Sequence, residues 1–497
     1  MATVNTNDLR IKNAKNFIDS LNGPSVTPEA QAYMFIGRPT PWADDNAPPV
    51  PRNNFKEFYN TYDEMLSLKR INDIDALHMI PRIRWTSGVT YDMYKDNYSI
   101  FNRSVNNQSN LYDCVYYVIN ASHVVYVCLF NNNNQASTVE PQDVGTEPFF
   151  TSDGYQWLKL YTVPNDDIAT RSTENFIPIV ENDVTDGTPG AIYTVVIDNP
   201  GNDYTNNPAG GPNQLPYYYC NIVGDGVGAV ARVKVTLGRI AEVSVVRNGA
   251  GYTEASLQFE ANKIYSSLSN LDAGISALNP LGDGTLRTTV VISPPGGWGT
   301  DLPRELGGTR VGVFSTLTDT DFDFTEGVSF RQIGIIQDPE FAPNTPENPD
   351  TMSATFAIYY NEVSGTQFSI GETIEQTVDI GSSVKVAKGT VVDVDTDNNI
   401  VKYFQDPFIH SDDDGSLYRF RTLASQSTGQ VLIVGVESNT VVTPEDYTGT
   451  KADLYFIAGY ADPEIIQYSG LMTYLTNQPP ITRADNQSEK ITLIVGY

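Results

Sequence analysis

The chain has 497 residues, 40% of them hydrophobic and only 18% charged, and 60 acidic against 31 basic residues give a formal net charge of −29. Such an acidic chain repels a phosphate backbone, and the short groups Lys69–Arg70 and Arg82–Arg84 form no basic stripe, so we expect no nucleic-acid partner. The length predicts two or three domains, and the acidity suits solubility or docking onto a basic partner surface.

The N-terminal residues are polar and lack the basic start and apolar run of a signal peptide. The densest apolar stretch, His123–Phe130, is too short to span a bilayer, so we expect no membrane anchor. Three cysteines, Cys114, Cys128 and Cys220, give no disulfide framework. Cys114 and Cys128 lie in strand-like runs and are expected to be buried free thiols, which fits folding in a reducing cytoplasm.

Two helices are expected near the N-terminus. The first carries an apolar stripe at the i, i+3, i+4, i+7 spacing and should stop at Gly23–Pro24; its stripe is Ala14, Phe17, Ile18 and Leu21. The second is expected over Phe55–Leu68, with one side formed by Phe55, Phe58, Tyr59, Tyr62 and Leu66.

Most of the remaining chain has the pattern of strands and turns. Tyr33–Ile36 is a short expected strand, and Tyr112–Ile119 with His123–Phe130 should form a hairpin around Asn120–Ser122. The 29 tyrosines, together with Val, Ile and Thr, suit half-buried pleated surfaces.

A two-copy internal repeat, called the echo below, lies in the Gly-, Asn- and Pro-rich segment from about 174 to 284. Val195–Thr205 aligns with Val243–Thr253 at an offset of 48 positions (243 minus 195), and each copy is a strand, a Gly turn and Tyr-Thr. Gly224–Ala229 between them leads into the alternating strand Val230–Val235. Two copies cannot build a long solenoid, so we predict a small inserted β module.

The strands resume from Thr288, and the run ends in a strand at Ile491–Val495. The segment 355–442 has short strand runs whose spacing suits a small antiparallel sandwich or barrel. We therefore predict a mainly β chain of layered antiparallel β-sandwich domains, with a few helices in loops near the N-terminus. The predicted division is 1–175, the inserted module at 176–287, and 288–497.

Candidate sites for chemistry are weak. His78, His123 and His410 share no ligand spacing. Asp393–Asn399 resembles the start of a calcium loop, but Phe404 holds the position of the closing glutamate, so a turn is favoured and weak calcium binding stays an alternative. The glycines of 224–228 precede a strand rather than a helix, which disfavours a phosphate cradle. No carboxylate pair is marked out, so we expect no catalytic residue, metal, cofactor or enzyme activity.

Four segments in chain order resemble the baseplate wedge subunit of T-even-like contractile-tailed bacteriophages, the gene product eight family. The first two are Tyr33–Asp45, followed by Pro48–Pro51, and Ile80–Tyr91 with Tyr94. The third joins Pro294–Asp301 and Arg304–Gly307 to Phe330–Ile336, and the fourth joins Ser469–Tyr474, Asn477 and Pro480–Arg483 to Gln487–Glu489.

The resemblance implies a structural protein of layered sandwiches that forms a homodimer in each wedge and binds other wedge proteins, of the gene product six, seven and ten types. It implies a location in the virion tail baseplate after assembly in the host cytoplasm. The region from about 176 to 287 departs from the family pattern as an insertion, and Trp298 stands where the family leads us to expect a histidine.

Six residues in these segments are candidate interface or loop anchors. Tryptophans in Pro-Gly-rich loops are either packing anchors or interface hot spots, and the arginines either bridge carboxylates at an interface or form surface pairs of little energetic value. These residues are Trp42, Arg82, Arg84, Trp85, Trp298 and Arg483. The alternative function is carbohydrate or host-surface binding by the 176–287 module, whose Tyr217–Tyr219 are expected to be exposed for stacking on sugar rings.

Overall fold

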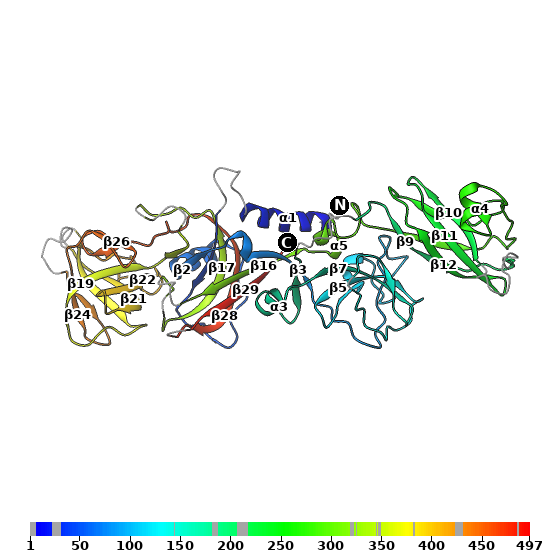
Figure 1. Cartoon of the computed structure of the whole chain (residues 1–497). Coiled ribbons are helices and arrows are strands. Elements are labelled where there is room, and N and C mark those ends of the chain that lie inside the picture. The colour runs from blue at the N-terminus through cyan, green and yellow to red at the C-terminus, as the bar shows by residue number, and fades with distance from the viewer. Residues whose placement is uncertain are drawn as a thin grey trace. The chain divides into compact units, whose positions relative to one another are not determined.

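The computed structural model describes residues 6–497 except 22–30, 144, 181–186, 206–216, 319–322, 325, 344, 346–348, 381–382, 423–430 and 485–486. Antiparallel strands dominate it, which confirms the mainly β prediction (Figure 1). The chain divides into two compact units: unit 1 comprises Met1–Lys15, Leu77–Gly312 and Gly496–Tyr497, and unit 2 comprises Asn16–Ala76 and Val313–Val495. The three-part division made from the sequence stays a prediction.

The first predicted helix is present as α1 (Asn7–Leu21), whose Ile11, Ala14 and Phe17 are buried. The Gly23–Pro24 stop lies outside the described residues. The strands β3 (Ala76–Pro81), β16 (Arg310–Leu317) and β29 (Glu489–Gly496), like α1, contain the points where the chain passes from one unit to the other.

Unit 1 contains a four-stranded sheet in the order β4-β5-β7-β6. Its members are β4 (Tyr117–Ile119), β5 (Val124–Asn131), β6 (Phe149–Phe150) and β7 (Tyr155–Thr162). The predicted hairpin is confirmed, since Tyr117 pairs with Val127 and Ile119 with Val125. The first strand starts later than expected, because Leu111–Asp113 forms a 3-10 turn in which the Asn110 side chain accepts the Tyr112 N–H. Cys114 and Cys128 are buried and free, as expected, and Cys220 is too.

Three short elements complete the part of unit 1 outside the module: α3 (Asn165–Thr170), β8 (Phe176–Pro178) and α5 (Leu302–Leu306). β8 pairs with β3, with Met79 opposite Pro178. Helix α5 begins at Asp301, whose side chain accepts the Arg304 N–H, and ends at Gly307 in the left-handed conformation.

The segment that carries the echo has a core of its own, drawn in green in Figure 1. Its elements are β9 (Ile192–Asn199), β10 (Tyr217–Gly224), β11 (Val230–Thr236), β12 (Arg239–Arg247), β13 (Ala255–Leu257), β14 (Ile264–Tyr265), α4 (Leu268–Ala273) and β15 (Arg287–Ile292). β12, β11, β10 and β13 are neighbours in one sheet, and β9 pairs with β15. Tyr217 and Tyr218 are buried, so the expectation that they are exposed is wrong.

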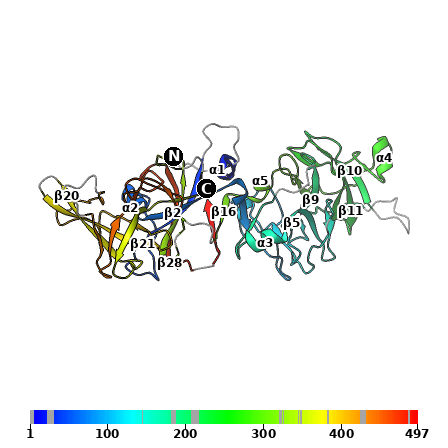
Figure 2. The same cartoon turned by 60° about the vertical axis from the view of Figure 1, so that its left-hand side comes forward.

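A five-stranded sheet in unit 2 has the order β18-β2-β1-β17-β28. Its strands are β1 (Ala32–Gly37), β2 (Met65–Arg70), β17 (Ser329–Gln337), β18 (Thr351–Ser353) and β28 (Leu471–Thr482). The predicted second helix is wrong in its second half: α2 (Phe55–Asp63) stops before β2 (Figure 2). Pairing of Leu68 with Phe35, both fully buried, outweighs the helix propensity of this run.

The rest of unit 2 contains a closed six-stranded barrel, one of the two architectures expected from the strand spacing (Figures 1 and 2). Its strands are β19 (Phe356–Ser364), β20 (Thr373–Ile380), β21 (Ser383–Asp395), β22 (Ile400–Phe404), β23 (Ile433–Gly435) and β24 (Val441–Pro444). Pairing of β22 with β19 closes the ring. The short strands β25 (Gly449–Lys451), β26 (Leu454–Phe456) and β27 (Tyr460–Ala461) follow.

The aspartate-rich run 393–399 contains the end of β21 and the hairpin turn that leads to β22, and a turn was favoured from its sequence. The Asp395 carboxylate accepts hydrogen bonds from the backbone and side-chain nitrogens of Asn398 at 2.9 and 2.8 Å. Asn399 has a positive φ of 59°, which asparagine tolerates in such turns.

Candidate interaction surfaces

Trp42 fixes the loop after β1 in unit 2. Its indole N–H donates to the carbonyl of Gln478 at 3.1 Å, and the Arg38 guanidinium carbon lies 3.7 Å from the centre of its ring. Its own backbone N–H donates to the Asp45 carboxylate at 2.8 Å. Trp42 is half-buried, so one part of the ring anchors the loop and the rest reaches solvent.

Arg483 is buried at the end of β28. Its Nε forms an ion pair with Glu489 at 2.7 Å, Nη2 donates to the Thr318 carbonyl at 3.1 Å, and Nη1 donates to the Phe324 carbonyl. The carboxylate that this arginine bridges belongs to its own unit.

The other three arginine and tryptophan candidates near residue 85 lie in unit 1. Arg82 is half-buried and donates to the Thr173 carbonyl at 3.1 Å; its burial, with help from Arg84, lowers its pKa. Arg84 is exposed, and no described residue bonds its side chain. The half-buried Trp85 donates its indole N–H to the Ser137 hydroxyl at 3.1 Å. Of this group, Arg84 is the one that offers a free charge at the surface.

Trp298 is buried, and its ring meets that of Tyr94 edge-to-face at 4.6 Å between centres. This contact joins the loop before α5 to the loop that follows residue 91, far apart in sequence. Tyr94 of this pair also lines a cavity described below.

Arg331 joins two of the loops that carry the phage resemblance. Its Nε and Nη2 bind the two carboxylate oxygens of Asp45 at 2.9 and 2.8 Å, and Nη1 donates to the Pro39 carbonyl at 2.7 Å. Nearby, the Asn477 amide donates to the Pro49 carbonyl at 2.7 Å. A two-point pairing between a planar guanidinium and a carboxylate fixes the orientation of both side chains and is stronger than a single hydrogen bond.

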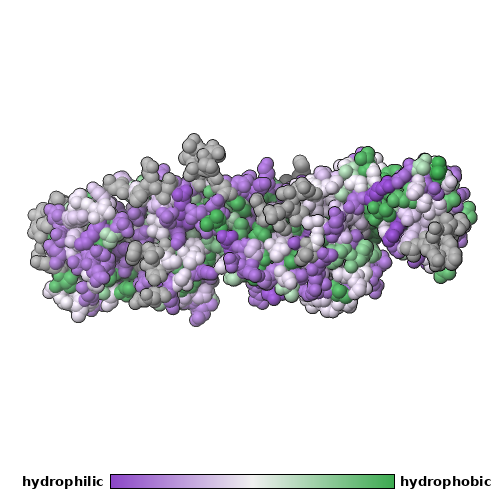
Figure 3. All heavy atoms as spheres, in the orientation of Figure 1, coloured by the Kyte–Doolittle hydropathy of each residue, from purple (hydrophilic) through white to green (hydrophobic). Residues whose placement is uncertain are grey.

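An aromatic patch lies exposed along α2 in unit 2. On the face shown in Figure 3, hydrophobic residues form separate patches within a largely hydrophilic surface. The aromatic patch consists of Phe55 (79% exposed), Tyr59 (53%), Phe408 (70%) and Tyr468 (47%). The Tyr59 and Tyr468 rings meet edge-to-face at 5.2 Å, and the Lys56 ammonium lies 5.2 Å from the Phe408 ring centre.

The patch has a regular local origin. Asn54 caps α2 by accepting the Glu57 N–H, and positions 55 and 59 share one helix face because they are four residues apart. Sequence periodicity identified this aromatic side of the helix. It gave no sign that Phe408 and Tyr468, about 350 and 410 positions away, extend the patch.

Buried acids lie beneath the aromatic patch. The Tyr468 hydroxyl donates to Asp63 at 2.5 Å. Glu64, also buried, pairs with Arg38 at 2.8 Å and accepts from Thr40. Burial outweighs Arg38 and raises the pKa of Glu64 to about 7, with smaller contributions from Asp406 and Asp63. Burial also raises the pKa of Asp63 and that of Asp406.

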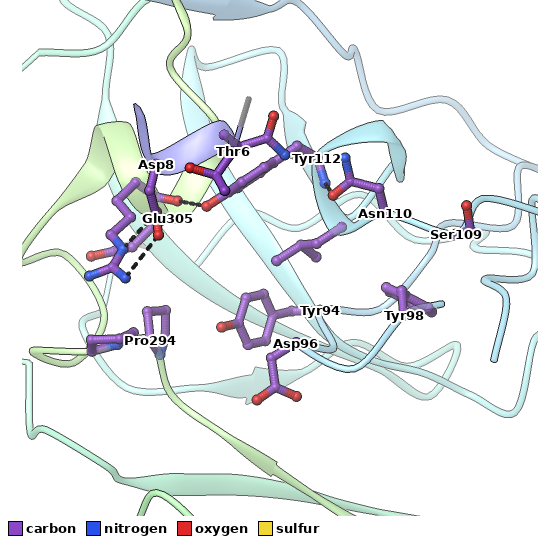
Figure 4. Close-up of a pocket in the computed structure, with 14 residues that line it drawn as sticks. Thr6, Asp8, Tyr94, Asp96, Tyr98, Ser109, Asn110, Tyr112, Pro294 and Glu305 are labelled. Carbon is purple, nitrogen blue, oxygen red and sulfur yellow. Dashed lines mark hydrogen bonds and ion pairs between the residues drawn. The ribbon is translucent and has the colours of Figure 1, made fainter. Parts of the chain in front are cut away.

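A cavity of about 450 Å³ opens in unit 1 beside the start of α1 (Figure 4). Asp8 of α1 and Arg304 of α5 form an exposed ion pair at 3.2 Å on its wall, and the Tyr112 hydroxyl donates to the Arg304 carbonyl at 2.6 Å. Tyr94 and Asp96 come from one loop and line the same space.

Glu305 contributes a second, buried acid to this cavity. Its two carboxylate oxygens accept the backbone N–H groups of Gly299 and Asp301 at 2.8 and 2.9 Å. Burial raises the pKa of Glu305, against those two hydrogen bonds. Of the residues that line the cavity, Tyr94, Pro294, Pro295, Arg304 and Glu305 belong to the segments that carry the phage resemblance. The sequence did not point to the other lining residues, because contacts such as that between Asp8 and Arg304 join positions 296 apart.

Within the described ranges, no three His, Cys, Asp or Glu side chains gather closely enough to hold a metal ion. The described helices include none that is long and apolar enough to cross a lipid bilayer. Compared with models of known protein families and with curated protein sequences, the chain gives no match.

Proposed function

We propose that the chain is a structural subunit of a contractile phage tail baseplate wedge and acts by binding neighbouring subunits rather than by catalysis. The observation that carries the proposal is the spatial convergence of the segments that resemble the wedge family. In unit 2, the first segment supplies β1, the end of the third supplies β17, and the fourth supplies β28. These are three adjacent strands of one sheet.

The loops of these segments are also tied to each other. Arg331 of the third segment binds Asp45 of the first, and Gln478, next to Asn477 of the fourth, accepts the Trp42 indole N–H. In unit 1, Tyr94 of the second segment packs on Trp298 of the third. These contacts support the proposal, because segments that carry one shared fold are expected to pack against each other.

The aromatic patch supplies a surface suited to a neighbouring subunit. Aromatic residues that are exposed together on a monomer are enriched in protein interfaces, where they act as buried anchors. We propose that a wedge protein or the second copy of a homodimer covers Phe55, Tyr59, Phe408 and Tyr468.

Purified virions and a pair of matched variants test the proposal. The chain should be found in the tail tip of virions by mass spectrometry and electron cryomicroscopy, and its absence from the tail would overturn the assignment. Phe408→Asp should weaken co-sedimentation with the dimer or wedge partners. Phe101→Asp, at a phenylalanine of unit 1 that is 94% exposed, should not. Equal behaviour of the two variants would exclude the patch as the contact.

Glycan or host-surface binding by the 176–287 module stays the alternative prediction. Its motivation is weaker now, because Tyr218 is buried with its hydroxyl donating to the Thr205 carbonyl at 2.7 Å, and Tyr217 is buried beneath Arg232. Glycan-array binding that disappears when the module is removed would favour this alternative.

A further inference from the structure

The cavity beside α1 is lined by a tyrosine hydroxyl that bonds to no described residue. Tyr94 is only 5% exposed, yet its hydroxyl has no hydrogen-bond partner in the described part of the chain. The neighbouring hydroxyls already have partners: that of Tyr98 donates to the Met93 carbonyl at 2.7 Å, and that of Tyr112 donates to the Arg304 carbonyl at 2.6 Å. The Tyr94 hydroxyl opens onto the cavity, so a ligand group there can bind it in place of water.

Burial raises the pKa of Tyr94, so this hydroxyl remains protonated and neutral at physiological pH. It can therefore both accept and donate a hydrogen bond. Its ring is held by edge-to-face contact with Trp298 at 4.6 Å and by the ring of Tyr116 at 6.0 Å, which fixes the hydroxyl in place.

A second uncommitted group in the cavity is an acceptor. Asp96 is exposed to the cavity, and no described residue forms an ion pair or hydrogen bond with its carboxylate. Asp8 is already paired with Arg304, and both oxygens of Glu305 already accept backbone N–H groups. Among the described carboxylates of the lining, that of Asp96 is therefore left without a partner, and the Tyr94 hydroxyl of the same loop is also free.

The charge of the lining favours a cation. Three carboxylates, those of Asp8, Asp96 and Glu305, face one guanidinium, that of Arg304. The excess is negative, as it is for the whole chain at −29. A neutral polyol would leave this charge unbalanced, whereas a cationic group would neutralise Asp96 directly.

We propose that this cavity receives the guanidinium of an arginine side chain presented by a neighbouring protein, which names the chemistry of one partner contact and rests on the assembly function proposed above. A guanidinium is planar and carries five N–H donors, so it can bind both oxygens of Asp96 while a remaining N–H reaches the Tyr94 hydroxyl. An ammonium group is a point donor and makes fewer of these contacts. The aromatic walls also favour a flat, weakly hydrated cation.

Binding of three short peptides to the full-length protein tests the proposal. They are acetyl-Gly-Arg-Gly-amide, its lysine counterpart, and its citrulline counterpart, which has nearly the same shape as arginine without the charge. Calorimetry or NMR titration should show the arginine peptide binding, the lysine peptide binding more weakly and the citrulline peptide not binding. Added salt should weaken binding. Equal binding of the arginine and citrulline peptides, or no binding of the arginine peptide, would overturn the proposal.

Matched variants assign the contact. Asp96→Asn should weaken binding of the arginine peptide by about ten-fold or more, because a charge-assisted hydrogen bond is lost. Tyr94→Phe keeps the ring contact with Trp298 and should weaken binding several-fold. Asp113→Asn, at an exposed acid nearby that does not line the cavity, should leave binding unchanged. Circular dichroism should show that all three variants fold.

Two further outcomes separate the possible failures. A neutral oligosaccharide that binds in the same titration and is lost in Asp96→Asn would replace the arginine proposal with a sugar site. Absence of the chain from phage tails would remove the wedge assignment, but would leave a measured arginine contact in place. Loss of arginine binding with the chain present in tails would remove the contact alone.

Discussion

Tyr204 and Tyr252 occupy equivalent positions in the two copies of the internal echo. The Tyr204 N–H donates to the Gly238 carbonyl at 3.0 Å, and the Tyr252 N–H donates to the Gly190 carbonyl at 3.3 Å. Both pairs of equivalents are 48 positions apart (252 minus 204, and 238 minus 190). The tyrosine of each copy therefore bonds to a glycine that lies just before the strand of the other copy. The two copies of the echo are thus joined by equivalent, reciprocal hydrogen bonds.

The same relationship explains why each copy has a glycine three residues before its tyrosine. Gly201 and Gly249 both have a φ of 62°, and a Cβ added to either would lie 2.7 or 2.8 Å from Cε2 of Tyr204 or Tyr252. The glycine thus supplies a left-handed turn and leaves room for the buried ring.

Gly249→Ala should destabilise the module more than a backbone penalty alone. Its Cβ would also meet the backbone N of Ala229 at 2.6 Å and the backbone O of Val227 at 2.7 Å, and neither atom can move freely. We expect a loss of roughly 1–2 kcal/mol from the positive φ, with a further loss of about 1–3 kcal/mol from overpacking. The measurement is denaturant unfolding followed by a probe in the module.

The control for this substitution is Gly284→Ala. Gly284 has a φ of 71° and no atom within 4 Å of an added Cβ, so it carries the backbone cost without the clash. Equal destabilisation of the two variants would show that the reciprocal packing around Gly249 adds nothing.

Deletion of residues 192–292 should leave a folded, soluble remainder. β9 and β15 pair along their length, and directly before and after them the Ser293 N–H donates to the Ala191 carbonyl at 2.9 Å. A short Gly-Ser join therefore spans the gap without strain. Cooperative thermal unfolding and a single sedimenting species would meet the expectation, and aggregation would show that the module belongs to the main core of unit 1.

The wider deletion of 176–287, the boundaries predicted from the sequence, should be worse tolerated. It removes β8, which pairs with β3 through Pro178 and Met79, and it leaves β15 without β9. We expect a lower melting temperature or insolubility relative to the 192–292 deletion.

The sequence predicted local features whose cause is local. The i, i+4 spacing of Phe55 and Tyr59 predicted the start of α2, and the polar run at Asp395 predicted the turn after β21. The end of α2 was mispredicted because Met65–Arg70 has good helix propensity, and only its pairing with β1 makes it a strand. That pairing is invisible in the local pattern.

The candidate sites depend even more on distant contacts. Asp8 and Arg304 are 296 positions apart, and Tyr59 and Tyr468 are separated by 409 (468 minus 59). Neither partner has an unusual sequence context. The tyrosines at 217–219 illustrate the opposite error. The run looked suited to a surface, but Tyr217 and Tyr218 are buried where β10 pairs with β11.

Arg331→Lys should destabilise unit 2 by about 2–3 kcal/mol. A lysine cannot bind both oxygens of Asp45 and also reach the Pro39 carbonyl, and the pair is largely buried at Arg331. The matched control is Arg247→Lys, which alters a similar two-point pair with Asp272 at the surface and should change stability much less, because exposed ion pairs contribute little. Chemical denaturation of both variants measures the two losses of stability. Equal losses would show that burial of the Arg331 contacts adds nothing to their contribution.

Glu64 should make the stability of unit 2 depend on pH between about 4.5 and 7. Its pKa in the folded chain, about 7, lies above the ordinary value of 4.5, so the folded state holds this proton more tightly than the unfolded state does. The resulting stabilisation is fully present below about 4.5 and is lost as the pH rises through 7. Glu64→Gln removes this titration. Between pH 4.5 and 7 the free energy of unfolding of the wild type should therefore fall by roughly 3 kcal/mol relative to that of the variant. Thermal unfolding of wild type, Glu64→Gln and the exposed control Glu174→Gln from pH 4.5 to 8 measures the difference. Parallel curves for wild type and Glu64→Gln would mean that Arg38 holds Glu64 ionised throughout.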